Sequence, residues 1–89
     1  MTNEQIAEVN RIHAAVDDFA SAMKTRLTQK LEAGYTGWDG EYPSSTLRRE
    51  LVGDALELWD TADDWNAVDI ANRAMMLWYR SECLRRAGE

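Results

Sequence analysis

This sequence has few of the residues and patterns that mark several other classes of protein. Cys83 is its single cysteine, so no intramolecular disulfide can form and a reducing compartment is expected. No apolar run approaches the roughly 18 residues that cross a bilayer, and the first residues do not have the form of an export signal. There is also no zinc pattern, no Ser-His-Asp arrangement and no phosphate-cradling glycine loop. We therefore expect a cytoplasmic protein without a membrane span.

Basic residues are outnumbered as well. The formal net charge is −6, from sixteen acidic and ten basic side chains, which disfavours non-specific binding to nucleic acid. The charge is unevenly distributed along the chain. Residues 50–69 contain seven carboxylates and no Lys or Arg, whereas four arginines follow between residues 73 and 86. One part of the chain repels phosphate, and the other can attract it.

The chain is short, and this limits the core that it can build. Eighty-nine residues are enough for one domain, residues 1–89, and a chain of this size buries only about 60 to 70 % of the surface that it exposes when unfolded. Helices that cannot bury their apolar faces within one chain require a partner. We therefore expect a homodimer in which the first and third helices share a core across the interface.

The pattern of the N-terminal third predicts one long helix over about residues 3–33. Thr2 and Gln5 have the spacing of a capping box, and Gly34 can end the helix in a left-handed conformation. Between them, apolar residues recur at spacings of three and four, which keeps them on one face of the helix. They are Ile6, Val9, Ile12, Val16, Phe19, Met23, Leu27 and Leu31.

The rest of the chain predicts an aromatic-rich ordered loop over residues 34–43 and a C-terminal helical hairpin, so the fold class is all-α. The hairpin helices are expected at about 45–60, capped by Ser44 or Ser45, and at about 67–85, capped by Asn66 with Asp69. Trp59 and Trp78 lie on the apolar stripes of these helices and are expected in the core. Trp38 and Trp65 are expected in loops, where they can stack on a base or anchor a partner.

One stretch carries a family resemblance. Residues 69–78 read DIANRAMMLW, which closely resembles a DVANFAMM segment in phage-encoded relatives of the MazG nucleotide pyrophosphohydrolases. The resemblance continues upstream in the same order over roughly residues 19–80. Phe19, Met23 and Leu27, with Arg26 in a Lys position, match a helical FxxxMxxKL pattern, and a glycine-tryptophan loop at Gly37 and a second helix follow it.

The resemblance implies an all-α protein that splits nucleoside triphosphates with magnesium, using carboxylates from an EExxE and an ExxD pattern. Only Glu50 and Asp69 match those patterns outright. Asp54 lies one residue after the third glutamate position, which Gly53 occupies, and Asn66 stands in the ExxD glutamate position. The candidate metal ligands are therefore Glu50, Asp54 and Asp69. An acidic helix face of this kind is in most proteins simply solvated.

Two further residues bear on the same region. Arg73 stands where the relatives carry Phe, and there it can pair with Asp69 and compete with a metal. Asn72 can contact either a phosphate or a neighbouring helix. With Trp38 and Trp65, these residues are the candidates for phosphate or partner contact.

Two hypotheses follow. The first is a phage-derived, catalytically degenerate binding protein on a MazG-like scaffold, without a cofactor, that docks on a host macromolecule, such as a host protein, or retains a nucleotide in the host cytoplasm. An inhibitor of a host defence system is one protein of this kind. The alternative is a magnesium-dependent (deoxy)nucleoside triphosphate pyrophosphohydrolase that uses Glu50, Asp54 and Asp69 with help from a second subunit.

Overall fold

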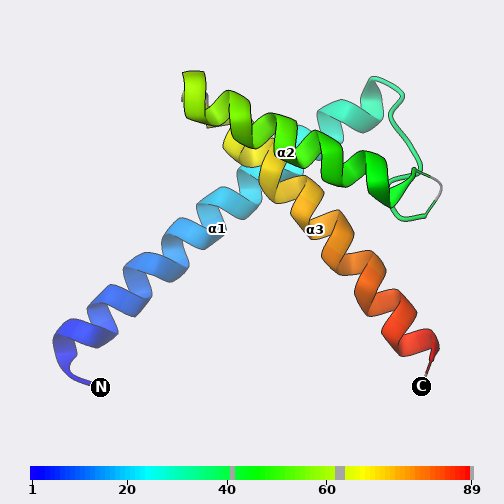
Figure 1. Cartoon of the computed structure of the whole chain (residues 1–89). Helices are drawn as coiled ribbons and strands as arrows, with labels where there is room; N and C mark the ends of the chain where they lie inside the picture. Colours follow the sequence, from blue (N-terminus) through cyan, green and yellow to red (C-terminus); the bar gives the residue numbers. More distant parts are fainter. Residues whose placement is uncertain (41, 62–63, 89) are drawn as a thin grey trace.

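The computed structural model describes residues 1–40, 42–61 and 64–88, and they form three helices without a strand (Figure 1). Helix α1 spans Asn3–Glu32, α2 spans Ser44–Thr61 and α3 spans Asp64–Ala87. The all-α prediction is confirmed, with a long first helix and a C-terminal hairpin. Within the described residues, no helix combines the length and the apolar character that crossing a membrane requires.

Both ends of α1 follow the predicted capping chemistry. The Thr2 hydroxyl accepts from the Gln5 amide at 3.1 Å, and the Gln5 side chain accepts from the Thr2 amide at 2.8 Å, which completes a capping box. At the other end, Gly34 takes φ +99°. Its amide donates to Leu31 O, and the Tyr35 amide donates to Lys30 O, each at 3.0 Å. This is a Schellman motif, which satisfies carbonyls left free at the helix end.

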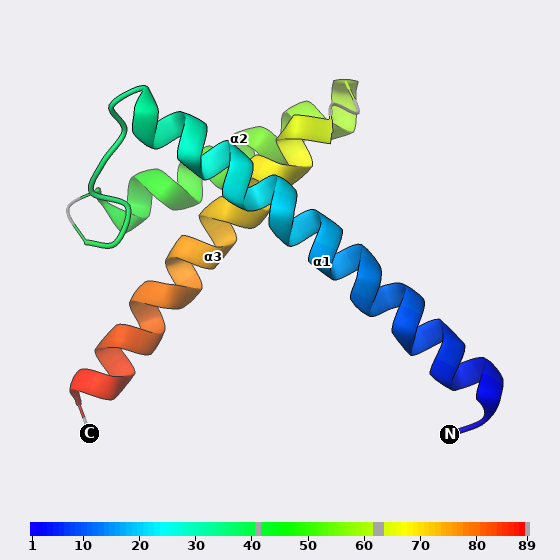
Figure 2. The same cartoon turned by 180° about the vertical axis from the view of Figure 1, so that it is seen from behind.

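The three helices cross at one place and then diverge. In Figure 1, α2 lies in front of the first part of α3, and Figure 2 shows α1 crossing α3 on the opposite face. Helix α3 therefore contacts both other helices. Away from the crossing, the N-terminal part of α1 and the C-terminal part of α3 spread apart like a V, and among the described residues only the start of the latter stays in contact with the loop and with the start of α2, through Tyr79 and Arg80. We call residues 3–19 the α1 arm and residues 77–87 the α3 arm.

Little apolar surface is buried in this arrangement. Among the described side chains, Leu47 of α2 and Val68 of α3 are the buried hydrophobic residues. The chain exposes 6896 Å², whereas a compact protein of its 10.2 kDa mass exposes about 5,300 Å². The radius of gyration, 15.8 Å, also exceeds the roughly 12 Å of a compact chain of this length. A single chain therefore leaves its apolar helix faces open.

The open arrangement corrects the prediction for two tryptophans. Trp59 is 88 % exposed and Trp78 is 62 % exposed, so neither lies in a core formed by one chain. Both residues lie on the apolar stripes, as expected, but the stripe of α2 is covered at its start, where Leu47 is buried, and open at Trp59. Helical periodicity predicts which residues share a face, and it does not predict which face a neighbouring element covers.

The start of α3 also differs from the prediction. The helix begins at Asp64, three residues early, so Asn66 and Asp69 are not capping residues. Asn66 is instead buried, and its Nδ2 donates to Asp54 O at 3.3 Å and to Glu57 Oε2 at 2.8 Å. Trp65 lies within α3, not in a turn. Between the two predicted hairpin helices, residues 62 and 63 lie outside the described residues.

Candidate functional site

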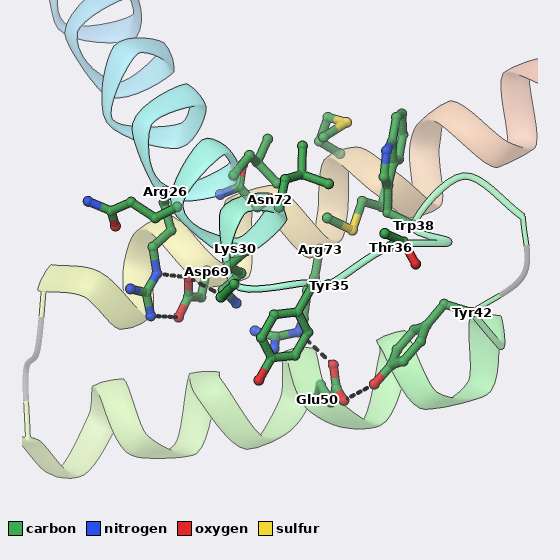
Figure 3. Close-up of a pocket in the computed structure, with 16 residues that line it drawn as sticks. Arg26, Lys30, Tyr35, Thr36, Trp38, Tyr42, Glu50, Asp69, Asn72 and Arg73 are labelled. Carbon is green, nitrogen blue, oxygen red and sulfur yellow. Dashed lines mark hydrogen bonds and ion pairs between the residues drawn. The ribbon is translucent and has the colours of Figure 1, made fainter.

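A cavity of about 640 Å³ lies where the end of α1, the following loop and the middle of α2 and α3 meet (Figure 3). Its lining is mixed in character. Cations come from α1 and α3, carboxylates from α2 and α3, and aromatic rings from the loop. The polar and aromatic lining residues are Arg26, Gln29, Lys30, Tyr35, Thr36, Trp38, Tyr42, Glu50, Asp69, Asn72 and Arg73. The cavity thus brings together five of the seven predicted site residues, while Asp54 and Trp65 do not line it.

Arg73 connects two of the candidate metal ligands. Its Nε donates to Glu50 Oε2 at 3.0 Å, and its Nη1 donates to Asp54 Oδ2. Arg73 reaches these carboxylates across the α2–α3 packing, since Glu50 and Asp54 share one face of α2, one turn apart. The pair that was predicted between Arg73 and Asp69 does not form, and Arg73 turns to α2 instead.

Asp69 has cationic partners of its own, and they come from α1. Arg26 Nε lies 3.1 Å from Asp69 Oδ1, Arg26 Nη2 lies 3.4 Å from Oδ2, and Lys30 Nζ lies 3.6 Å from Oδ1. Arg26 and Lys30 are one turn apart, so both reach the same carboxylate. The pairing joins residues 43 positions apart in the chain, which no local pattern predicts.

The surroundings shift the pKa values of the two α2 carboxyls in opposite directions. Burial acts to raise the pKa of Glu50, but hydrogen bonds from Tyr42 and Arg73 outweigh it and the pKa is lowered. Burial also raises the pKa of Asp54, and there the nearby Arg73 does not fully offset it. The Tyr42 pKa is raised because its hydroxyl donates to Glu50. Glu50 is therefore held as a carboxylate acceptor by two donors.

The loop that closes the cavity is held by Arg80, a role that the sequence did not indicate. Arg80 Nε and Nη2 donate to Trp38 O at 2.9 and 2.6 Å, and its Nη1 donates to Ser44 Oγ at 3.1 Å. The Trp38 ring packs on Tyr79 with centroids 5.2 Å apart. Ser44 is the first residue of α2, and its hydroxyl accepts the hydrogen bond from Arg80. Trp38 is therefore a packed part of the wall of the site.

Asn72 and Trp65 complete the set of predicted contact residues. Asn72 is buried, and its Nδ2 donates to Met23 O at 3.3 Å, so it joins α3 to α1. Its Oδ1 finds no hydrogen-bond partner among the described residues. A buried acceptor of this kind favours a donor from water or a ligand. Trp65 lies beside the site, with the Arg26 guanidinium 5.3 Å from its ring centroid.

Magnesium, which the resemblance implies, does not fit this set of donors. A divalent cation needs carboxylate oxygens that are open to it, but Arg73 contacts Glu50 and Asp54, and Arg26 and Lys30 contact Asp69. These three carboxylates thus face three fixed positive charges. Within the described part of the chain, no cluster of three or more Asp, Glu, His or Cys is arranged to hold a metal.

Comparisons of this chain with protein families, curated proteins and solved structures give no match. The resemblance to the MazG relatives therefore rests on the sequence segments quoted above.

Proposed function

We propose that this chain is a non-catalytic binding protein that docks on another protein through an apolar face of α2. The observation that carries the proposal is the exposed area of 6896 Å², about 1,600 Å² above that of a compact protein of this mass. A standard protein–protein interface removes about 800 Å² from each partner. The open surface is thus large enough for more than one interface.

The α2 face has the character of a binding surface. Val52, Leu56 and Trp59 follow one another at helical spacing and are all exposed. Trp59, at 88 % exposed, is the type of residue that contributes most to binding when it enters a pocket. Exposed Glu57 and Asp60 flank the stripe. The matching partner is a protein with an apolar groove and a basic rim, since these carboxylates repel phosphate backbones.

The charge pairs around the cavity support the non-catalytic part of the proposal. Arg73, Arg26 and Lys30 neutralise the carboxylates that a pyrophosphohydrolase would use for magnesium. Under this proposal, the chain keeps a scaffold like that of the MazG relatives and uses it for binding in the host cytoplasm. The host partner is then a protein, and inhibition of a host defence system is one outcome of that binding.

Two experiments test the proposal. In the first, pyrophosphate release from the standard ribo- and deoxynucleoside triphosphates is measured with Mg²⁺ or Mn²⁺ for the parent, Glu50→Ala and Asp69→Ala. We expect no release from any of them. Turnover in the parent that both variants lose would restore the enzyme hypothesis.

In the second, proteins captured by the tagged chain are identified and purified, and their affinities for the parent, Trp59→Ala and Tyr35→Ala are measured. Tyr35 is the control because it is also an exposed aromatic residue but lies outside α2. We expect the Trp59 change to weaken binding at least about tenfold, which is typical of an anchoring tryptophan. Equal affinities for all three chains would exclude the α2 face.

The cavity supports a second candidate, retention of a nucleotide without a metal. Tyr35, Trp38 and Tyr42 offer rings for a base. The unsatisfied Asn72 Oδ1 can accept from a base N–H. Calorimetry with nucleoside mono- and triphosphates in EDTA tests this candidate. Saturable heat that Trp38→Ala abolishes and Trp59→Ala retains would support it, and no heat with any nucleotide would exclude it.

A further inference from the structure

The α1 and α3 arms extend beyond the helix crossing and carry large apolar side chains that are exposed to solvent. On the α1 arm, Ile6, Ile12, Val16 and Phe19 are exposed at helical spacing. On the α3 arm, Trp78 and Leu84 are exposed and border a groove of about 410 Å³ between α3 and the start of α2. Arg48 and Arg80 also line that groove. The α1 arm therefore has an uncovered apolar stripe, and the α3 arm carries exposed apolar side chains beside a groove.

The two arms carry opposite charge. Residues 3–19 contain four carboxylates and one guanidinium, a net charge of −3, while residues 77–87 contain three arginines and one glutamate, a net charge of +2. The acidic residues Glu4 and Glu8 lie near the free end of the α1 arm. Arg85 and Arg86 lie near the free end of the α3 arm. Contact between the two kinds of arm is therefore attractive, whereas contact between like arms is repulsive.

We propose that two copies of this chain form a symmetric dimer in which the α1 arm of each lies antiparallel along the α3 arm of the other. The half turn between Figure 1 and Figure 2 exchanges the sides on which the N-terminal and C-terminal arms lie. A two-fold axis along the vertical direction of these views therefore places α1 of each copy beside α3 of the other. The two equivalent contacts form one self-complementary interface.

The physical properties of the arms agree with this pairing. The apolar stripe from Ile6 to Phe19 is about 20 Å long, which is close to the roughly 16 Å length of the eleven-residue α3 arm. Antiparallel contact sets the positive end of the α1 helix dipole against the negative end of the partner's α3. It also brings Glu4 and Glu8 toward the partner's arginine-rich end. The alternative symmetric pairing, α1 with α1, brings two net charges of −3 together.

This inference deepens the proposed function, because it assigns the arms to a second copy and leaves the exposed stripe of α2 for the other protein. The mass of the purified full-length chain is measured by light scattering and sedimentation equilibrium, without any partner. We expect a dimer for the parent. Ile12→Asp should produce a monomer and Val52→Asp should not, although the two residues are similarly exposed at 52 and 57 %. A monomeric parent would overturn the inference while leaving the docking test through Trp59 intact.

Charge reversal tests which arms meet. One variant carries Glu4→Lys and Glu8→Lys, a second carries Arg85→Glu and Arg86→Glu, and a third carries all four changes. We expect each two-residue variant to weaken dimerisation at least tenfold and the four-residue variant to recover most of it. Circular dichroism checks that each variant stays helical. If the two-residue variants dimerise as the parent does, α1 does not pair with α3 and the proposed arrangement is wrong.

Discussion

At the residue scale, the charge partners of Glu50, Asp54 and Asp69 determine what the cavity can bind. Two of these carboxylates share the single guanidinium of Arg73, which is 17 % exposed. A carboxylate held this way offers its oxygens to N–H donors and not to a metal. The chemistry of the site therefore depends on Arg73. This residue lies four positions after Asp69, where the MazG relatives carry Phe.

Replacing Arg73 with Ala should release both α2 carboxylates. We expect a loss of about 1 to 3 kcal/mol in unfolding free energy, because two partly buried charges lose their common partner. The freed pair should also bind Mn²⁺ detectably in calorimetry, which the parent should not. Arg48→Ala is the control, since Arg48 is exposed and, two residues before Glu50, lies on the opposite side of α2. A variant that stays folded without Mn²⁺ binding would show that the guanidinium is not what blocks a metal.

Glu50 should contribute to the acid dependence of stability. Its folded pKa lies below the ordinary 4.5, so its contribution is present above about that pH and is lost as pH falls through the lower folded value. Glu50→Gln should therefore unfold more easily at neutral pH and lose less stability on acidification than the parent. Asp54, whose folded pKa is raised, acts in the opposite sense and remains in both proteins.

Denaturant titrations at several pH values between neutrality and acid measure this difference. The exposed Glu32 provides a matched Glu→Gln control. Parallel pH profiles for the parent and Glu50→Gln would contradict the shifted pKa.

At the element scale, local features were predictable and long-range ones were not. The capping box at Thr2 and the stop at Gly34 depend on residues within one or two turns, and both are confirmed. The start of α3 was predicted wrongly because Asn66 resembles a cap but binds α2 instead. The Arg26–Asp69 pair depends on how the helices cross, which periodicity does not encode.

Two glycine substitutions should act in opposite directions. Gly34→Ala should destabilise the fold by about 1 kcal/mol, because φ is +99° there and an L-side chain is strained at that angle. Gly53→Ala should stabilise it by about 0.5 to 1 kcal/mol, since alanine favours a helix interior. An added Cβ meets no atom within 4 Å at either position, so packing does not contribute. Thermal melts that rank the two variants in the reverse order would contradict the assigned conformations.

Trp38 should contribute more to stability than Trp59, although Trp59 was expected in the core and Trp38 in a loop. Trp38→Ala should cost about 1 to 3 kcal/mol, less than for a fully buried ring, because half-buried Trp38 packs on Tyr79 in the wall that Arg80 holds. Trp59→Ala should cost under about 0.5 kcal/mol, as is usual at exposed positions. Chemical denaturation of the two variants measures the difference. A larger loss for Trp59 would mean that α2 packs on something in solution that the single chain does not show.

At the scale of the whole molecule, a single chain builds only a thin core. The buried hydrophobic side chains among the described residues are Leu47 and Val68, which is little for a stable domain of this length. If the arms associate as proposed, much of the apolar burial belongs to the dimer. The stability of such a chain depends on its concentration.

Thermal unfolding should therefore shift with protein concentration. Each tenfold increase adds about 1.4 kcal/mol to the free energy of a dimer, which for two chains of this size corresponds to a rise in Tm of roughly 3 to 6 °C. Calorimetric scans over a hundredfold concentration range measure the shift. The monomeric Ile12→Asp variant should melt at a lower and concentration-independent temperature, because its arms stay uncovered. A parent protein whose Tm is high and independent of concentration would show that the crossing of α1, α2 and α3 is stable alone, and that its open arms do not need a second copy.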